Sequence, residues 1–136
     1  MSEMSWAATM RFVHERAQFM CEYCQTSQRI IAQAMHVEHI NPDSGDHPDN
    51  LCLSCSSCNL SKGQAIAALD TRTGVSVPLF NPRTQVWTEH FAWSKSGRRV
   101  IGLTAAGRAT IIRLKMNLKR VVDARAIWVS AGLHPP

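Results

Sequence analysis

The stretch that decides the fold runs from His36 to Gly63 and reads HVEHINPDSGDHPDNLCLSCSSCNLSKG. It holds a Glu-His dipeptide at residues 38–39 and a Cys-x-x-Cys pair at residues 55–58. A second Cys-x-x-Cys pair lies upstream at residues 21–24. One such pair is common, but two pairs on either side of a Glu-His dipeptide are unusual. The arrangement predicts a site built on metal ions.

The four paired cysteines match the ligand preference of zinc, which binds four thiolates in a closed tetrahedron. The expected ligands of a structural Zn²⁺ are Cys21, Cys24, Cys55 and Cys58. The segment between Cys24 and Cys55 is longer than in a simple zinc ribbon, which indicates a functional loop between the pairs. Structural zinc contributes on the order of 10 kcal/mol to a small fold. The alternative is four unligated or redox-active cysteines.

Composition sets the class of protein. The chain has 136 residues, a hydrophobic fraction of 45% and a formal net charge of +5, which fit one globular domain with a polyanionic partner. No apolar run reaches the roughly 18 residues needed to cross a bilayer, and residues 1–5 lack the features of a signal peptide. We therefore expect a cytoplasmic protein, where paired cysteines bind metal more often than they form disulfides. The fifth cysteine, Cys52, is expected to be a buried strand residue.

Hydrophobic spacing and turn residues predict a mixture of helices and short strands. Trp6, Met10, Val13 and Ala17 recur at helical spacing and predict a helix over residues 5–20. The other expected elements are a strand or hairpin at 29–38, a loop at 41–49, a strand at 51–53, a helix at 56–69, strands at 73–77, 86–93 and 99–103, and helices at 105–117 and 118–130.

The motif order over residues 21–63 resembles the HNH endonucleases, whose core is the ββα-metal fold. It runs Cys-x-x-Cys, Val-Glu-His-Ile, Asn-Leu, then Cys-x-x-Cys-Asn-x-x-Lys-Gly. Segments 77–83, 87–91 and 102–108 are similar to one bacterial branch of that family. The resemblance implies the ββα-metal core, and the elements expected around it give an α+β fold with an N-terminal helix before the core and a small strand-plus-helix extension after it. We expect a single domain over residues 1–136, with its zinc-containing core at 21–69 and its extension at 70–136.

The resemblance also implies site roles and an activity. His39 matches the general base that activates water, and Asn50 matches the residue that orders the loop and helps orient the base. Glu38, at a position usually held by Asp, and Asn59 match the two protein ligands of the catalytic ion. The implied reaction is cleavage of DNA with Mg²⁺, Mn²⁺ or another divalent ion, leaving a 5′ phosphate and a 3′ hydroxyl.

These residue types suit phosphodiester hydrolysis on chemical grounds as well. Histidine titrates near neutral pH and can take a proton from water. Mg²⁺ takes oxygen ligands and keeps several waters, so the carboxylate of Glu38 and the amide oxygen of Asn59 form a plausible protein set. His36 is a further candidate, as a metal ligand or phosphate contact, with a surface histidine as the alternative. Lys62 lies one helical turn after Asn59 and is either a phosphate contact or a solvated lysine.

Basic residues crowd the end of the chain. Between residues 97 and 125 they are Arg98, Arg99, Arg108, Arg113, Lys115, Lys119, Arg120 and Arg125. We expect Arg108, Arg113 and Lys115 to contact the phosphates of double-stranded DNA, which gives affinity with little sequence specificity. The alternative is a solvated charged face.

Two readings from other classes compete with a nuclease. One is a non-catalytic zinc module that binds nucleic acid, and the other is a structural zinc protein in a larger assembly. Mere binding has no need of a general base, so the Glu-His pair with its two asparagines argues for the enzyme. Restriction, phage DNA processing, homing and repair are all roles that such an enzyme could serve.

Overall fold

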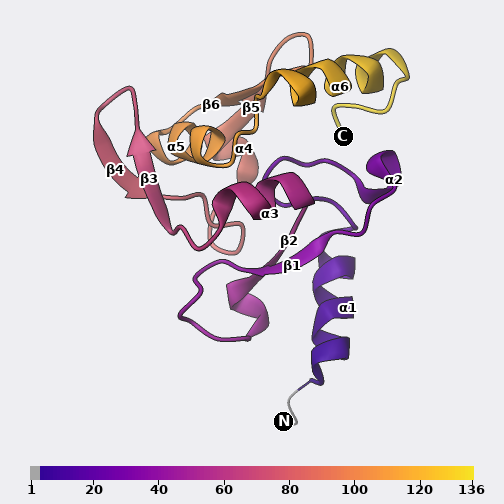
Figure 1. Cartoon of the computed structure of the whole chain (residues 1–136), viewed down its shortest axis with the longest axis vertical. Coiled ribbons are helices and arrows are strands. Elements are labelled where there is room, and N and C mark those ends of the chain that lie inside the picture. Colours follow the sequence, from indigo (N-terminus) through magenta and orange to yellow (C-terminus); the bar gives the residue numbers. More distant parts are fainter. Residues whose placement is uncertain (1–3) are drawn as a thin grey trace.

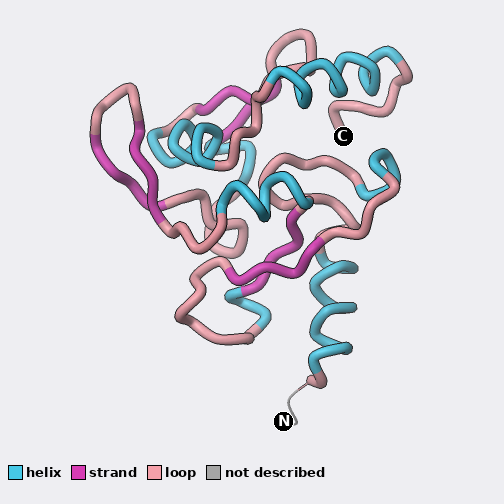
Figure 2. Tube along the Cα trace, viewed as in Figure 1, coloured by secondary structure: helices cyan, strands magenta, loops and turns pink. Residues whose placement is uncertain are grey.

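A computed structural model describes residues 4–136 (Figures 1 and 2). The elements in chain order are α1 (Trp6–Arg16), α2 (Gln28–Ile31), β1 (His36–His39), the 3-10 helix η1 (Pro48–Asn50), β2 (Leu51–Ser54), α3 (Ser56–Lys62), β3 (Ala67–Asp70), β4 (Val75–Pro78), α4 (Trp87–His90), β5 (Phe91–Trp93), β6 (Val100–Gly102), α5 (Ala105–Arg113) and α6 (Lys119–Ser130). The fold is α+β, as the sequence predicts. Its strands form three antiparallel two-stranded sheets.

The centre of the molecule is the β1–β2 hairpin followed by α3 (Figure 1). Glu38 pairs with Cys52 and His39 with Leu51 across the hairpin. Every residue of β2 is buried, so this strand forms part of the core on both of its faces. Helix α3 begins directly after it, with Cys55 as its N-cap residue. This strand–strand–helix order is the one expected of a ββα core.

Two predicted elements near the N-terminus are shorter than expected. The helix predicted at 5–20 ends at Arg16, because Gln18 and Phe19 adopt left-handed backbone conformations (φ 54° and 58°). The strand predicted at 29–38 begins instead as the short helix α2, where Ser27 accepts a hydrogen bond from the Arg29 amide. A serine at this position satisfies a free amide of the first helical turn.

The helix predicted at 56–69 was wrong in its second half. Helix α3 ends at Lys62, and Gly63 takes a positive φ of 55° that favours glycine. The chain then forms β3, which pairs with β4. Strand pairing has therefore overridden the helical preference of the alanines at 65–68.

The segment predicted as a strand at 86–93 is also different. Its first part is the single helical turn α4, and only Phe91–Trp93 forms a strand. The turn places the Trp87 ring against Phe91 and Trp93, with ring centroids 5.1 and 5.6 Å apart. Aromatic packing of this kind stabilises a conformation that local preference does not favour.

The C-terminal extension packs on the first cysteine pair. Nε1 of Trp87 donates to the carbonyl oxygen of Tyr23 at 2.8 Å, and Nε1 of Trp93 donates to Oε1 of Gln25 at 3.3 Å. The Arg83 guanidinium pairs with Glu22 in the same loop. One hydrophobic cluster extends from Val13 on α1 through the cysteines to Leu114 and Met116. The extension therefore helps to shape the cysteine loop.

His90 has a structural role in this extension. Its Nδ1 lies 2.7 Å from Oγ1 of Thr104, the residue that caps α5. Its carbonyl oxygen accepts a hydrogen bond from the Leu103 amide. A Cβ at Gly107 would lie 2.2 Å from that oxygen, so only glycine allows this close approach. His90 thus joins α4 to the start of α5. Within residues 4–136, no helix combines the length and the apolar character needed to span a membrane.

Candidate functional site

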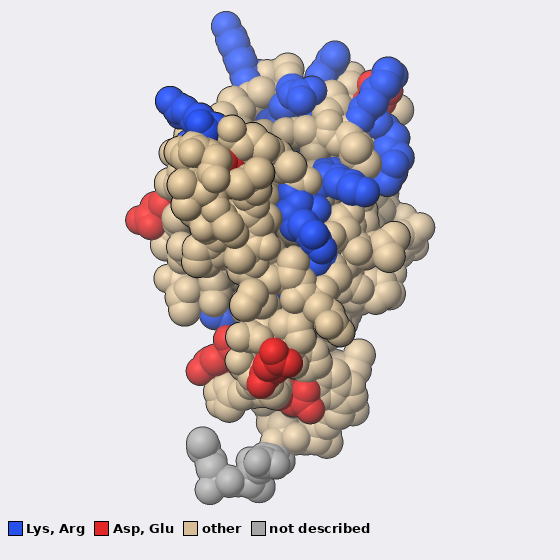
Figure 3. All heavy atoms as spheres, turned by 60° about the vertical axis from the view of Figure 1, so that its left-hand side comes forward, with Lys and Arg blue, Asp and Glu red and all other residues tan. Residues whose placement is uncertain are grey.

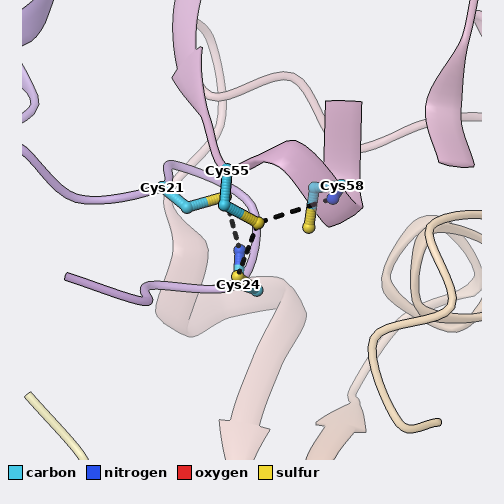
Figure 4. A group of neighbouring side chains, drawn as sticks. All are labelled: Cys21, Cys24, Cys55 and Cys58. Atoms are coloured by element: carbon cyan, nitrogen blue, oxygen red, sulfur yellow. Dashed lines mark hydrogen bonds between the residues drawn. The ribbon is translucent and has the colours of Figure 1, made fainter. Parts of the chain in front are cut away.

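Four buried cysteines converge between the first cysteine loop and α3 (Figure 4). They are Cys21, Cys24, Cys55 and Cys58, and their sulfur atoms all lie within 4.8 Å of one another. Sγ of Cys24 lies 3.7 Å from Sγ of Cys55. Tetrahedral zinc with Zn–S bonds of about 2.3 Å separates its sulfurs by about 3.8 Å. The cluster therefore fits a closed Zn²⁺ site.

Backbone amides surround the sulfur atoms. The Cys24 amide donates to Sγ of Cys21 at 3.5 Å, and the Cys58 amide donates to Sγ of Cys55 at 3.4 Å. Gln25, with a φ of 61°, makes the sharp turn that closes the first loop. Hydrogen bonds, first from Cys21, lower the pKa of the Cys24 thiol, whereas burial raises the pKa of Cys21. Four thiols this close need a cation before all can ionise.

Cys52 stands apart from this cluster, as the sequence predicts. It is fully buried in β2, and its thiol donates to Oη of Tyr23 at 3.6 Å. Burial raises the pKa of Cys52 to about 12. It is therefore an unreactive core thiol.

His39 lies at the end of β1 with its side chain 37% exposed. Its Nε2 lies 2.6 Å from Oδ1 of Asp46, and its ring stacks on Trp6 at 8° with the centroids 6.5 Å apart. In the tautomer that donates Nε2–H to Asp46, the lone pair is on Nδ1. That nitrogen has no hydrogen-bond partner in the described part of the chain. In that tautomer the ring is held on two sides, and Nδ1 is available for a water molecule.

Asp46 and Trp6 are residues that sequence reasoning missed. Asp46 lies in the polar loop among other turn-forming residues, and no spacing rule connects it to His39. Trp6 was assigned to the apolar stripe of the first helix. It is 46% exposed at the start of α1, and no signal in the sequence separates it from the other apolar residues of that helix.

Asn50 ties the loop that carries Asp46. Its Nδ2 donates to the carbonyl oxygens of Asn41 and Gly45, both at 2.8 Å, and its Oδ1 accepts from the Asn41 amide at 2.9 Å. A single side chain therefore satisfies three backbone groups of the loop. Asn50 therefore joins the start and the middle of this loop.

Glu38 faces α3 and is only 7% exposed. Its Oε1 lies 3.5 Å from Nζ of Lys62, and neither carboxylate oxygen accepts a hydrogen bond from any described residue. Burial raises the pKa of Glu38, and the Lys62 ammonium opposes that rise. A buried carboxylate whose oxygens lack hydrogen bonds is rare, and such oxygens are suited to bind a cation, either the Lys62 ammonium or a metal ion.

Lys62 is 1% exposed. Its ammonium donates to the carbonyl oxygens of His39 at 3.4 Å and Ile40 at 3.2 Å. Lys62 therefore holds the end of β1 against α3, and a buried ammonium does not fit the expected contact with a DNA phosphate.

Asn59 lies on α3 one turn before Lys62, on the side of the helix that residues three apart share. It is half-buried, and its side-chain amide forms no hydrogen bond with the described residues. The carboxylate of Glu38 and this amide oxygen have the hard-donor chemistry of an Mg²⁺ site. Apart from the four cysteines, residues 4–136 contain no group of three His, Cys, Asp or Glu side chains that could hold a metal. Water would have to complete the coordination of an ion at Glu38 and Asn59.

His36, the other candidate ligand, contacts the start of α3. It is exposed on β1, and its Nε2 lies 3.1 Å from Oγ of Ser56. His47 is also exposed and accepts a hydrogen bond from the Asp49 amide.

The basic residues at the C-terminal end have different environments. Arg108 binds Asp70 with two hydrogen bonds of 3.0 and 2.9 Å, which hold the pKa of Asp70 well below its usual range. Arg125 is fully buried. The exposed residues are Arg98, Arg99, Arg113, Lys115, Lys119 and Arg120. Lysine and arginine side chains gather at the upper end of the molecule in Figure 3, and several acidic ones lie at its lower end.

One comparison with known proteins found a match. Residues 21–65 match the model of the HNH endonuclease family. No curated protein and no solved structure matches the chain. The matched residues contain both cysteine pairs, the β1–β2 hairpin and α3. Residues 21–65 of this chain are therefore similar to the HNH endonucleases, and they form a ββα core with four cysteines placed to bind zinc.

Proposed function

We propose that the chain is a metal-dependent endonuclease that hydrolyses phosphodiester bonds in DNA. The observation that carries this proposal is the His39 ring, held by Asp46 and Trp6 at the end of β1, inside the segment that matches the HNH family. A binding module has no need of an oriented histidine beside a buried carboxylate. In the proposed mechanism the histidine is the general base and the carboxylate of Glu38 is a metal ligand.

In this mechanism Nδ1 of His39 takes a proton from the attacking water. The Asp46 carboxylate accepts Nε2–H throughout and stabilises the charged imidazolium that forms. Glu38 and Asn59 would hold one divalent ion, Mg²⁺ or Mn²⁺. Such an ion supplies positive charge to a phosphate oxygen and to the departing 3′ oxygen. Asn50 keeps the loop in place, so that Asp46 stays within reach of the imidazole.

Zinc has a structural role in this proposal. Four thiolates close the tetrahedron, so no coordination position is left for water or substrate. The metal would join the first cysteine loop to the start of α3, the helix that carries Asn59. Reduced cysteines of this kind are typical of the cytoplasm, and we propose that the protein is located there.

The proposed DNA surface contains Arg113 and Lys115 at the end of α5. Both are exposed, whereas Lys62 is buried and Arg108 is bound to Asp70. Phosphate contacts by arginine and lysine give binding that is nearly independent of sequence. We therefore expect double-stranded DNA of many sequences to bind.

Cleavage of supercoiled plasmid tests the proposal. The purified chain is incubated with Mg²⁺, Mn²⁺ or EDTA, and His39→Ala is compared with His47→Ala, an exposed histidine whose side chain interacts with Asp49 in its own turn. We expect metal-dependent cleavage that falls roughly 10²–10⁴-fold in His39→Ala and stays unchanged in His47→Ala. Binding of plasmid without cleavage under every metal condition would instead establish a non-catalytic zinc module.

A further inference from the structure

Arg125 of α6 is a buried cation with an unusual environment. Its side chain is 0% exposed, and its Nη1 donates to the carbonyl oxygen of Arg98 at 3.0 Å and to Oδ1 of Asn117 at 3.1 Å. The guanidinium carbon lies 5.2 Å from the centre of the Trp93 ring. These contacts hold the group in one orientation.

The positive charge of Arg125 is not neutralised by a carboxylate. No aspartate or glutamate among residues 4–136 forms an ion pair with it. Its Nε and Nη2 atoms are buried without a hydrogen-bond partner. A buried charge that lacks a counter-charge is strongly destabilising, so the fold must compensate it in another way.

The cysteine cluster lies along the same cavity as Arg125 and becomes negative when its thiols ionise. Arg125 lines a cavity of about 480 Å³ between α3 and α6, and Cys24, Cys55 and Cys58 line the same cavity. Burial lowers the pKa of Arg125, and the nearby Cys24, Cys58 and Cys55 oppose that change, as negative thiolates do. Arg125 and these three cysteines therefore line one space.

Zinc bound by four thiolates carries a net charge of about −2, because four negative sulfurs exceed the two positive charges of the ion. That charge is buried with the cysteines. We propose that Arg125 is the counter-charge of the zinc–thiolate centre, so that α6 of the C-terminal extension sets the zinc affinity of the HNH segment. Zinc binding and the docking of α6 then stabilise one another. The inference concerns zinc alone and does not depend on DNA cleavage.

The first test compares Arg125→Met with Arg120→Met. Arg120 lies on the same helix and lines the same cavity but is exposed. Zinc affinity is measured by competition with a chromophoric chelator. Loss of a group outside the ligand shell typically costs 10–100-fold in metal affinity, and we expect that loss in Arg125→Met and an unchanged affinity in Arg120→Met. A folded Arg125→Met protein with wild-type zinc affinity would overturn the proposal.

A second comparison separates charge from packing and applies even if Arg125→Met does not fold. Arg125→Lys keeps the positive charge, whereas Arg125→Gln keeps N–H donors without the charge. The proposal requires tighter zinc binding by Arg125→Lys than by Arg125→Gln, and equal affinities would refute it.

The charge of the site can also be changed directly. Cys58→His reduces the charge of the centre by one, and absorption of bound Co²⁺ checks that the site still forms. The affinity cost of Arg125→Gln should then be smaller than in the four-cysteine protein, because there is less charge to compensate. An unchanged cost would mean that Arg125 acts by packing alone and would also overturn the proposal.

Discussion

Oδ1 of Asp46 lies 2.6 Å from Nε2 of His39. Asp46 occupies a loop position that no sequence motif assigns to the site. We predict that Asp46→Ala lowers kcat for plasmid cleavage while the KM for DNA stays near wild type. The decrease in kcat should be smaller than the roughly 10²–10⁴-fold that a positioned base supplies, because the imidazole is still present but no longer oriented. Asp43→Ala, in the same loop, is the matched control and should be active. Equal activity of the two variants would exclude Asp46 as the partner of the base.

Cys58→Ser should destabilise the whole chain, because it removes one of four thiolates beside the helix that carries Asn59. Elemental analysis should find about one zinc per chain in the wild type and much less in this variant. Cys52→Ser is the control, since Cys52 is equally buried but lies outside the cluster. Wild-type protein purified without chelators and free of zinc would contradict the assignment.

Lys62→Met should destabilise the fold by about 3–5 kcal/mol, because it leaves the buried Glu38 carboxylate without its nearest cation. Urea unfolding measures the loss. The double variant Glu38→Gln/Lys62→Met should recover part of that stability, since no uncompensated charge then stays buried. A double variant as unstable as the sum of both single variants would show that the two side chains do not interact.

Arg113→Gln/Lys115→Gln should weaken DNA binding to unrelated sequences and flatten its salt dependence. Each lost phosphate contact reduces the slope of log affinity against log salt by about 0.9. Arg108→Gln should change that slope much less, because Arg108 is engaged by Asp70. Titrations at several salt concentrations give both slopes, and an unaltered slope in the double variant would place the DNA surface elsewhere.

The Asp70–Arg108 pair should make the free energy of unfolding depend on pH in the acidic range. Hydrogen bonds from Arg108 hold the pKa of Asp70 below its unfolded value of about 3.9. A depressed pKa contributes stability that is present above the unfolded value and is lost as pH falls towards the folded one. The stability difference between wild type and Asp70→Asn should therefore be constant above about pH 5 and shrink below it. Urea unfolding between neutral and acidic pH measures this difference.

Much of the centre could be read from spacing along the chain. The Cys-x-x-Cys pairs predict the cluster, because ligands three residues apart reach one metal from a tight turn or a helix start. The Glu-His dipeptide and the Cys-Asn sequence at residues 58–59 predict the HNH match at residues 21–65. The helix preference of the local sequence was a less reliable guide where strands pair with one another. Residues 67–70, for example, form β3 instead of a helix.

The sequence by itself therefore determined the four cysteines that cluster, the Glu-His pair and the motif order that matches the HNH family. Only the tertiary structure decided how charges and rings surround those residues. Asp46 reaches His39 through a folded loop, Lys62 is buried beside Glu38, and Arg125 comes to the cysteine cavity from the far end of the chain. Such contacts join residues that no helical or strand period relates. They follow from the packing of whole elements and the need of each buried charge for a partner.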